Sequence, residues 1–216
     1  MISDLDSYVG RVISSIDNAG LTNNTLIIFS SDNGTTHASN STNFHVGGVD
    51  ATFFNSTAGL RGYKGSVYEG GIRVPMIAKL PGVIPVSVCD APCYFADWFP
   101  TLCEAASIDT PAGLDGQSLW PILKGGVSPT DRKPMLWVFP EYGGQVAVRI
   151  GKWKAIRREL KTKNIADWEV YDLQQDRNEQ QNLASAQPDV IKQAEAILRR
   201  EVDDNDTFPL KIPGVN

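Results

Sequence analysis

The sequence places an aspartate, an asparagine and a glycine directly after a short apolar run. Ser31, Asp32, Asn33 and Gly34 follow residues 25–30 (TLIIFS), whose β-branched and apolar side chains predict a strand buried on both faces, as in a parallel sheet. In open α/β sheets ligands bind beyond the carboxyl ends of the strands, and carboxylate and amide oxygens suit Ca²⁺ or Mg²⁺. Asp32 and Asn33 are therefore candidate metal ligands. The alternative is a simple turn, because Asn-Gly is a strong turn former and Asp is a common capping residue.

A glycine-rich segment with one lysine and two arginines follows at residues 60–75 (LRGYKGSVYEGGIRVP). Glycines allow the backbone to approach an anion closely, and Lys64 supplies a compact positive charge, so this segment is a candidate anion site. Glu69 and Arg73 lie four residues apart, a spacing that predicts a structural ion pair on one helical turn. The alternative is a glycine-rich surface turn with a solvated lysine.

Five segments, taken together, resemble the sulfatases, the formylglycine-dependent sulfuric ester hydrolases related in fold to alkaline phosphatase. They occur in the order of that family: TLIIFSSDNG, LRGYKGSVYEGGIRVPMIAKLPG, DWFPTLCEAASI with LDGQSLWPILKG, GKWKAI, and VYDLQQDRNEQQNLA. The resemblance implies that Asp32 and Asn33 are two oxygen ligands of a single divalent cation, commonly Ca²⁺, and that Lys64 touches the sulfate. It also implies a formylglycine hydrate that attacks sulfur, while the cation and the lysine stabilise charge on the sulfate oxygens.

Two histidines lie in the loop between the candidate ligands and the lysine. The family often presents polar substrate contacts in this loop, so His37, and after it His45, are candidate substrate-binding residues. The alternative for both is a solvent-exposed or capping histidine.

The nucleophile of the family comes from a C/S-x-P-x-R stretch, and this chain contains none. Cys89, Cys93 and Cys103 lack the proline and the arginine, and Ser128 has its proline one position early. The chain therefore resembles the C-terminal half of a sulfatase. We expect the complete protein to hydrolyse aryl or carbohydrate sulfates and this chain alone to be inactive and to bind Ca²⁺ poorly. The alternative is a non-catalytic module that binds sulfated glycans or completes a site with another chain.

The elements that must position these residues follow an α/β pattern. Residues 3–20 predict an amphipathic helix capped by Ser3, residues 76–80 a second buried strand, and residues 95–106 a helix. Four strand-like runs with a turn at Gly151-Lys152, and a helix over 188–202, predict a small antiparallel sheet packed on a C-terminal helix; the runs are 135–139, 146–150, 153–157 and 168–173. We expect residues 1–133 to form the C-terminal part of a sulfatase α/β core with a partial mixed or parallel sheet, and 134–216 a small α+β subdomain.

Composition limits the function classes. The 216 residues carry 20 Lys and Arg against 25 Asp and Glu, a net charge of -5, which disfavours nucleic acid as a partner. With 42% hydrophobic residues we expect a packed core. Residues 1–20 lack a signal-peptide pattern and no apolar run reaches membrane-spanning length, so we expect no membrane contact.

The remaining expectations concern cysteines, compartment and assembly. Cys89, Cys93 and Cys103 predict one local disulfide or three buried thiols rather than a metal cluster. The sequence does not fix a compartment, although the resemblance implies a periplasmic or secreted complete protein. A sulfate-ester small molecule or a sulfated carbohydrate is the expected partner. A partial sheet exposes an edge and apolar patches, which predicts self-association.

Overall fold

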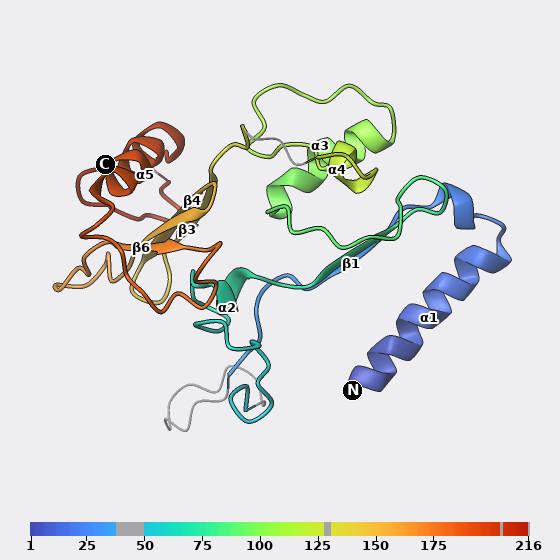
Figure 1. Ribbon diagram of the computed structural model, residues 1–216, viewed down its shortest axis with the longest axis horizontal. Coiled ribbons are helices and arrows are strands. Elements are labelled where there is room, and N and C mark those ends of the chain that lie inside the picture. Colours follow the sequence, from blue (N-terminus) through green and yellow to red (C-terminus); the bar gives the residue numbers. More distant parts are fainter. Residues whose placement is uncertain (38–49, 128–130, 204, 216) are drawn as a thin grey trace. The chain divides into compact units, whose positions relative to one another are not determined.

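A computed structural model describes residues 1–37, 50–127, 131–203 and 205–215, which group into two compact units (Figure 1). The first unit comprises Met1–Ser30 and Pro75–Asp131, and the second comprises Ser31–Val74 and Arg132–Asn216. Helices, a two-stranded ribbon and a four-stranded antiparallel sheet together give the expected α/β class. In these ranges no helix has the length and apolar character needed to cross a membrane.

The first unit carries helices around one β-ribbon. Its elements are α1 Ile2–Asn18, η1 Thr22–Asn24, β1 Ile27–Ser30, β2 Met76–Lys79, η2 Phe95–Asp97, α3 Trp98–Ala105 and α4 Trp120–Leu123. The predicted N-terminal helix is confirmed, but its predicted cap is wrong, because α1 already begins at Ile2 and Ser3 lies inside it. The prediction of a parallel strand buried on both faces is also wrong. β1 is antiparallel to β2, with Ile27 opposite Lys79, and Phe29 is exposed, because an apolar run does not encode the direction of its partner.

A buried aspartate holds the α3 region of the first unit together. Asp97 accepts hydrogen bonds from the backbone N–H groups of Tyr94 and Gln117, each at 2.9 Å. Thr101 is also buried; its hydroxyl donates to the Asp97 carbonyl at 2.6 Å and accepts from the Leu119 N–H at 2.8 Å. These four bonds join η2, α3 and the start of α4, so polar contacts rather than a broad apolar face organise this region.

The three cysteines lie in or before α3 and no disulfide bond joins them. Cys89 is exposed, whereas Cys93 and Cys103 are half-buried. Neither expected arrangement, a local disulfide or three buried thiols, is therefore present. Packing around this segment is too shallow to bury every thiol, since neighbouring Phe95, Phe99 and Leu102 are exposed too.

The second unit contains the predicted antiparallel sheet. Its strands, in the order β3-β4-β5-β6, are β3 Met135–Phe139, β4 Gln145–Ile150, β5 Trp153–Arg157 and β6 Glu169–Asp172. Every neighbouring pair is antiparallel, and a turn at Gly151, with φ of 58°, connects β4 to β5. The final helix, α5, spans Pro188–Glu201. These elements confirm the small sheet-and-helix unit predicted from the sequence.

The two faces of this sheet are covered by different parts of the chain. Helix α5 lies against one face of the sheet (Figure 1). Its predicted apolar stripe packs against inward side chains of the strands and consists of Val190, Ala194, Ile197 and Leu198. On the other face Ala147, Ile156 and Tyr171 pack against Val67 and Tyr68. The short helix α2, Glu69–Ile72, follows these two residues directly. A domain boundary at residue 133 stays a prediction, but the compact units place residues 31–74 with the C-terminal sheet.

Candidate active site

The short helix α2 lies in direct backbone contact with the segment that carries Asp32 and Asn33. The N–H of Gly34 donates to the carbonyl of Gly71 at 2.8 Å, and the N–H of Gly70 donates to the carbonyl of Arg61 at 2.7 Å. A Cβ atom on Gly34 would lie only 1.9 Å from the carbonyl oxygen of Gly70. Glycine is therefore required here for close approach, a role that sequence spacing alone did not separate from that of a turn former.

The loop that carries Lys64 is tied to the same segment. The Lys64 N–H donates to the carbonyl of Thr35 at 2.9 Å, which places the lysine loop beside the strand end that bears Asp32 and Asn33. Buried Gln145 of β4 also holds this loop: its amide nitrogen donates to the Gly65 carbonyl at 2.9 Å. The side chain of Lys64 is exposed, so its ammonium group is available to an anion in solution.

The two candidate metal ligands, Asp32 and Asn33, differ in the side-chain oxygens that they leave available. Asp32 is exposed, and the side-chain nitrogen of Asn33 donates to the Gly34 carbonyl at 2.9 Å, which leaves the amide oxygen as the atom suited to a cation. In the described ranges, no group of three or more His, Cys, Asp or Glu side chains is arranged to hold a metal ion. Ca²⁺ takes 6 to 8 oxygen ligands, so Asp32 and Asn33 fit this cation in donor type but not in number.

His37 lies next to the lysine loop. Its ring stacks on Tyr63, with centroids 4.4 Å apart and an interplanar angle of 16°. The Nδ1 atom is buried and has no hydrogen-bond partner in the described part of the chain. The structure thus brings His37 toward Lys64, although the role of this histidine as a substrate contact stays a prediction. His45 and Ser128 lie outside the described residues.

A cluster of charged side chains holds α2 in place; its members are Glu69, Arg73, Lys154 and Glu179. Glu69 accepts from Lys154 Nζ at 2.8 Å and from Arg73 Nε at 2.6 Å, so the predicted Glu69–Arg73 pair is confirmed. Lys154 Nζ lies 2.9 Å from Glu179 Oε1, within ion-pair distance, but this oxygen accepts no well-aligned hydrogen bond. Burial would raise the pKa of Glu69, yet the charges of Lys154 and Arg73 outweigh it and lower the pKa below its ordinary value. For Glu179, burial dominates and raises the pKa.

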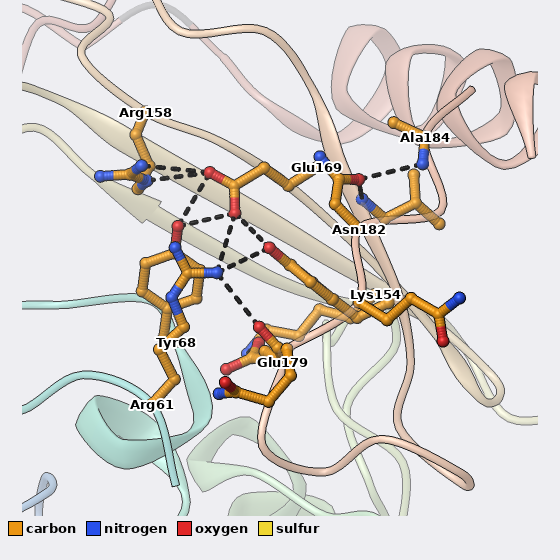
Figure 2. Close-up of polar contacts among 12 residues, drawn as sticks. Arg61, Tyr68, Lys154, Arg158, Glu169, Glu179, Asn182 and Ala184 are labelled. Carbon is orange, nitrogen blue, oxygen red and sulfur yellow. Dashed lines mark hydrogen bonds and ion pairs between the residues drawn. The ribbon is translucent and has the colours of Figure 1, made fainter. Parts of the chain in front are cut away.

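A second cluster surrounds Glu169, as Figure 2 shows. Its carboxylate accepts from the hydroxyl of Tyr68 at 2.7 Å and from Arg158 Nη2 at 3.1 Å. Arg61 Nη1 donates to the hydroxyl of Tyr171 at 2.7 Å and to the carbonyl of Glu179 at 3.1 Å. Burial, followed by the hydrogen bonds to Glu169, raises the pKa of both tyrosines, so they stay protonated donors. The Arg61 side chain is thereby committed to internal contacts.

Sequence reasoning did not find the residues that support this site. These residues lie about 80 or more positions after Lys64 in the chain, in the C-terminal part of the second unit. They are Gln145, Lys154, Glu169 and Glu179. One signal was present: Lys154 occupies an inward position of β5 on the same face as Ile156, where an apolar residue is usual. A lysine in that place indicates a buried counter-charge, although it does not identify Glu69 or Glu179.

Comparison with known proteins decides the family. Residues 1–108 match the sulfatase family, and residues 62–205 match the family described as N-sulphoglucosamine sulphohydrolase, C-terminal. The chain belongs to the sulfatase family. The match to a C-terminal family over residues 62–205 agrees with the predicted resemblance to the C-terminal half of a sulfatase.

Curated relatives extend this result. Human arylsulfatase A is 32% identical over 236 residues, covering 96% of this chain and 44% of the relative. Arylsulfatase K of zebrafish (Danio rerio) is 28% identical over 209 residues, covering 94% of this chain and 36% of the relative. This sulfatase chain therefore spans less than half the length of these two relatives.

Solved structures share the fold. One, described in work on the metabolism of multiple glycosaminoglycans by Bacteroides thetaiotaomicron, aligns with a TM-score of 0.71 at 26% identity, over 91% of this chain and 42% of that chain. Another, solved in complex with its substrate D-glucosamine-2-N,6-O-disulfate, aligns with a TM-score of 0.69 at 22% identity, over 92% of this chain and 39% of that chain. The second likeness shows the fold alone.

Proposed function

We propose that this chain is the part of a sulfatase that presents a metal-binding strand end and a sulfate-binding lysine, and that the complete protein hydrolyses sulfate esters of aryl or carbohydrate alcohols. Sulfuric ester hydrolysis is supported by the family to which the chain belongs. A formylglycine nucleophile is part of the proposal, but the chain contains no C/S-x-P-x-R stretch to supply it. We therefore propose that the isolated chain is inactive.

The proposed roles of the residues follow from their chemistry. Asp32 and Asn33 would coordinate Ca²⁺ or Mg²⁺ through their side-chain oxygens, and this cation would supply positive charge opposite the sulfate oxygens. The Lys64 ammonium donates hydrogen bonds to the sulfate and stabilises the charge that develops in the transition state. His37, stacked on Tyr63 beside this loop, contacts the substrate.

The observation that carries the proposal is the hydrogen bond from the Lys64 N–H to the Thr35 carbonyl at 2.9 Å. This bond joins the lysine loop to the strand-end segment only three residues beyond Asp32. Lys64, the proposed sulfate-binding residue, and the two candidate metal ligands, Asp32 and Asn33, therefore lie on adjacent backbone segments. A site that binds sulfate and a metal ion together requires this arrangement. Two unrelated surface turns would need no such bond.

The test uses a chromogenic aryl sulfate. We expect turnover by the complete protein, no turnover by this chain alone, and loss of about 10²–10³ in kcat for Lys64→Ala, the range found when one charge-stabilising donor is removed. Lys79→Ala, on the exposed side of β2, is the matched control and should retain activity.

Calorimetry should show weak Ca²⁺ binding by this chain, and tight binding would contradict a two-ligand partial shell.

A sulfated carbohydrate is the substrate class that we favour. A structural relative that is 26% identical was described in connection with glycosaminoglycan metabolism. A comparison of kcat/KM for a sulfated monosaccharide and for a simple aryl sulfate tests this preference in the complete protein.

A non-catalytic glycan-binding module is less well supported. Such a module needs several cations on one surface to hold a polyanion, and Arg61, the other candidate beside Lys64, is committed to Tyr171 and to the Glu179 carbonyl. Retention of this chain on a sulfated-glycan column at physiological salt would restore the alternative.

We propose in addition that the isolated chain self-associates through its first unit. No residue of α1 is buried, and Leu5 and Val12 on its apolar face are exposed. The β1-β2 ribbon has only two strands among the described residues, so each strand presents an outer edge for pairing. Light scattering over a concentration series tests this, and a strictly monomeric chain at high concentration would refute it.

A further inference from the structure

The position of α2 determines the position of both loops of the proposed site. The carbonyl of Gly71 accepts from Gly34, and the N–H of Gly70 donates to Arg61, so one four-residue helix is bonded to the metal-ligand segment and to the lysine loop. A Cβ on Gly71 would lie 2.1 Å from the Ser66 carbonyl, which shows that no space separates these backbones. A shift of α2 therefore moves Asp32, Asn33 and Lys64 relative to any bound substrate.

The anchor of α2 is Glu69, whose side chain is 4% exposed. Its carboxylate accepts from Lys154 Nζ at 2.8 Å, and its backbone N–H donates to Glu179 Oε2 at 2.7 Å. Both partners, Lys154 and Glu179, belong to the C-terminal part of the second unit, and Figure 2 labels both side chains. The first residue of α2 is thus held through its side chain and its backbone at once.

Lys154 is the group on which this anchor depends. It lies on β5, is completely buried, and is within 2.9 Å of both carboxylates. Without this ammonium charge, the Glu69 carboxylate would keep the partly exposed Arg73 and the electrostatic attraction of Arg149, and the Glu179 carboxylate would lose the ammonium group that lies 2.9 Å from it. Two buried carboxylates with insufficient counter-charge separate or take up protons, and either change releases α2.

We infer that Lys154 is a positioning residue for the proposed site, and that by pairing with Glu69 and Glu179 it fixes α2 and so holds the Asp32-Asn33 segment and the Lys64 loop in register. This inference rests on the proposed function for its catalytic meaning. Displacements of about 1 Å in such groups are enough to cost about 10² in rate. The C-terminal sheet therefore acts on the chemistry without touching the substrate.

The test measures amide hydrogen exchange in the whole chain, so it needs no catalytic activity. We expect Lys154→Met to accelerate hydrogen exchange of the Gly34 and Lys64 N–H groups by about tenfold or more, relative to the N–H groups of Val146 and Val148 in β4. The reason is that the free energy of local opening around α2 then falls below the free energy of global unfolding. Lys152→Met is the matched control. It makes the same substitution two residues away, at a 46% exposed side chain paired with Asp172, and should leave both amides unchanged.

If Lys154→Met does not fold, the same exchange experiment is carried out with Glu69→Gln. It leaves Lys154 paired with Glu179, keeps the shape of the side chain, and should produce the same local acceleration to a smaller degree. Uniform acceleration at all amides would reduce Lys154 to a structural role, and unchanged exchange at Gly34 and Lys64 would also overturn the inference. Lack of sulfate-ester turnover by the complete protein would instead refute the proposed function and leave the exchange result intact.

In the complete protein the same substitution gives a kinetic readout. Because Lys154 is buried away from solvent, we expect Lys154→Met to lower kcat by about 10² with a smaller change in KM, as for a group that positions others. A rise in KM alone would contradict the positioning role.

Discussion

Burial of charge at Glu69, Lys154 and Glu179 is unusual, because ionised side chains are rarely fully buried unless they are paired. Lys154 lies within ion-pair distance of two carboxylates at once, and Arg73, at the edge of the cluster, pairs with Glu69 as well. The two carboxylates respond differently: opposite charges lower the pKa of Glu69, whereas burial raises the pKa of Glu179. The cluster should therefore make stability depend on pH in two separate windows.

We predict that Glu179→Gln becomes more stable relative to wild type as pH rises above 4.5, the ordinary pKa of a glutamate side chain. Burial raises the pKa of Glu179 above its ordinary value of 4.5, so the folded protein binds more protons than the unfolded chain just above this pH. Stability of the wild type then falls as pH rises through the window, and glutamine, which does not titrate, removes that loss. The Glu69 contribution has the opposite sign and is lost as pH falls below 4.5, because the pKa of Glu69 is lowered.

Urea unfolding at several pH values measures this difference. The groups that face Glu179 are Lys154, the Glu69 carboxylate and N–H, and Arg61 through the Glu179 carbonyl. Glu201→Gln, at the exposed end of α5, controls for general charge effects. A stability difference between Glu179→Gln and wild type that is constant over this range would show that burial does not control the ionisation of Glu179.

The environment of His37 leads to a second prediction, which separates substrate binding from stability. Nδ1 makes no hydrogen bond in the described part of the chain, and the ring stacks on Tyr63, so His37→Phe should change the free energy of unfolding by less than about 0.5 kcal/mol. His37→Ala loses the stack and should cost about 0.5–1.5 kcal/mol. If His37 contacts the substrate, the phenylalanine variant of the complete protein raises KM for the sulfate ester. An unchanged KM would assign His37 to packing alone.

The composition of helix α2 is unusual, since two of its four residues are glycine. Glycine disfavours helix by about 1 kcal/mol relative to alanine, so local propensity does not explain this helix. Its neighbours do: the backbone of α2 touches the Gly34 segment on one side and the loop at residues 61–66 on the other. Tertiary contact outweighs intrinsic preference here.

We predict that Gly34→Ala destabilises the second unit by about 1–3 kcal/mol, the usual cost of overpacking. The added Cβ would lie 1.9 Å from the carbonyl oxygen of Gly70, and neither backbone is able to move without breaking the bond from Gly34 to Gly71. Gly10→Ala is the control, because a Cβ there meets nothing within 4 Å and alanine favours the helix α1. Chemical denaturation of both variants checks the contrast, and an equal effect at the two positions would mean that α2 does not press on Gly34.

These elements also show which parts of the structure the sequence could predict. The patterns of residues 135–202 predicted β3 to β6 and α5 to within one residue at each end, because consecutive strands pair with one another and α5 packs one apolar face on them. The direction of β1 against β2 was not predictable, since those strands pair across a long loop and apolar residues carry no directional information. The candidates Asp32, Asn33 and Lys64 came from local motifs. Their support from Gln145, Lys154 and Glu179 depends on contacts between distant segments, which one sequence does not encode in a readable form.

The order of segments along the chain differs from their grouping into the two compact units. Residues 31–74 leave the first unit after β1, pack on the C-terminal sheet through Val67 and Tyr68, and return to the first unit at β2. A cut after residue 133, where the change in sequence pattern suggests a boundary, would therefore separate the proposed site from the sheet on which it packs. The consequence is open to experiment.

We predict that a chain ending at residue 133 loses order in residues 60–74 although it keeps every candidate site residue. Val67 and Tyr68 would become exposed, and Glu69 would lose Lys154 and the cap supplied by Glu179. Limited proteolysis with trypsin should then cut rapidly after Arg61 and Arg73, both of which are half-buried and bonded in the full chain. The full chain digested in parallel is the control. Equal resistance of these two sites in both chains would mean that the loops of the proposed site hold their conformation without the C-terminal sheet, and would remove the physical basis for assigning that sheet a role in positioning Lys64.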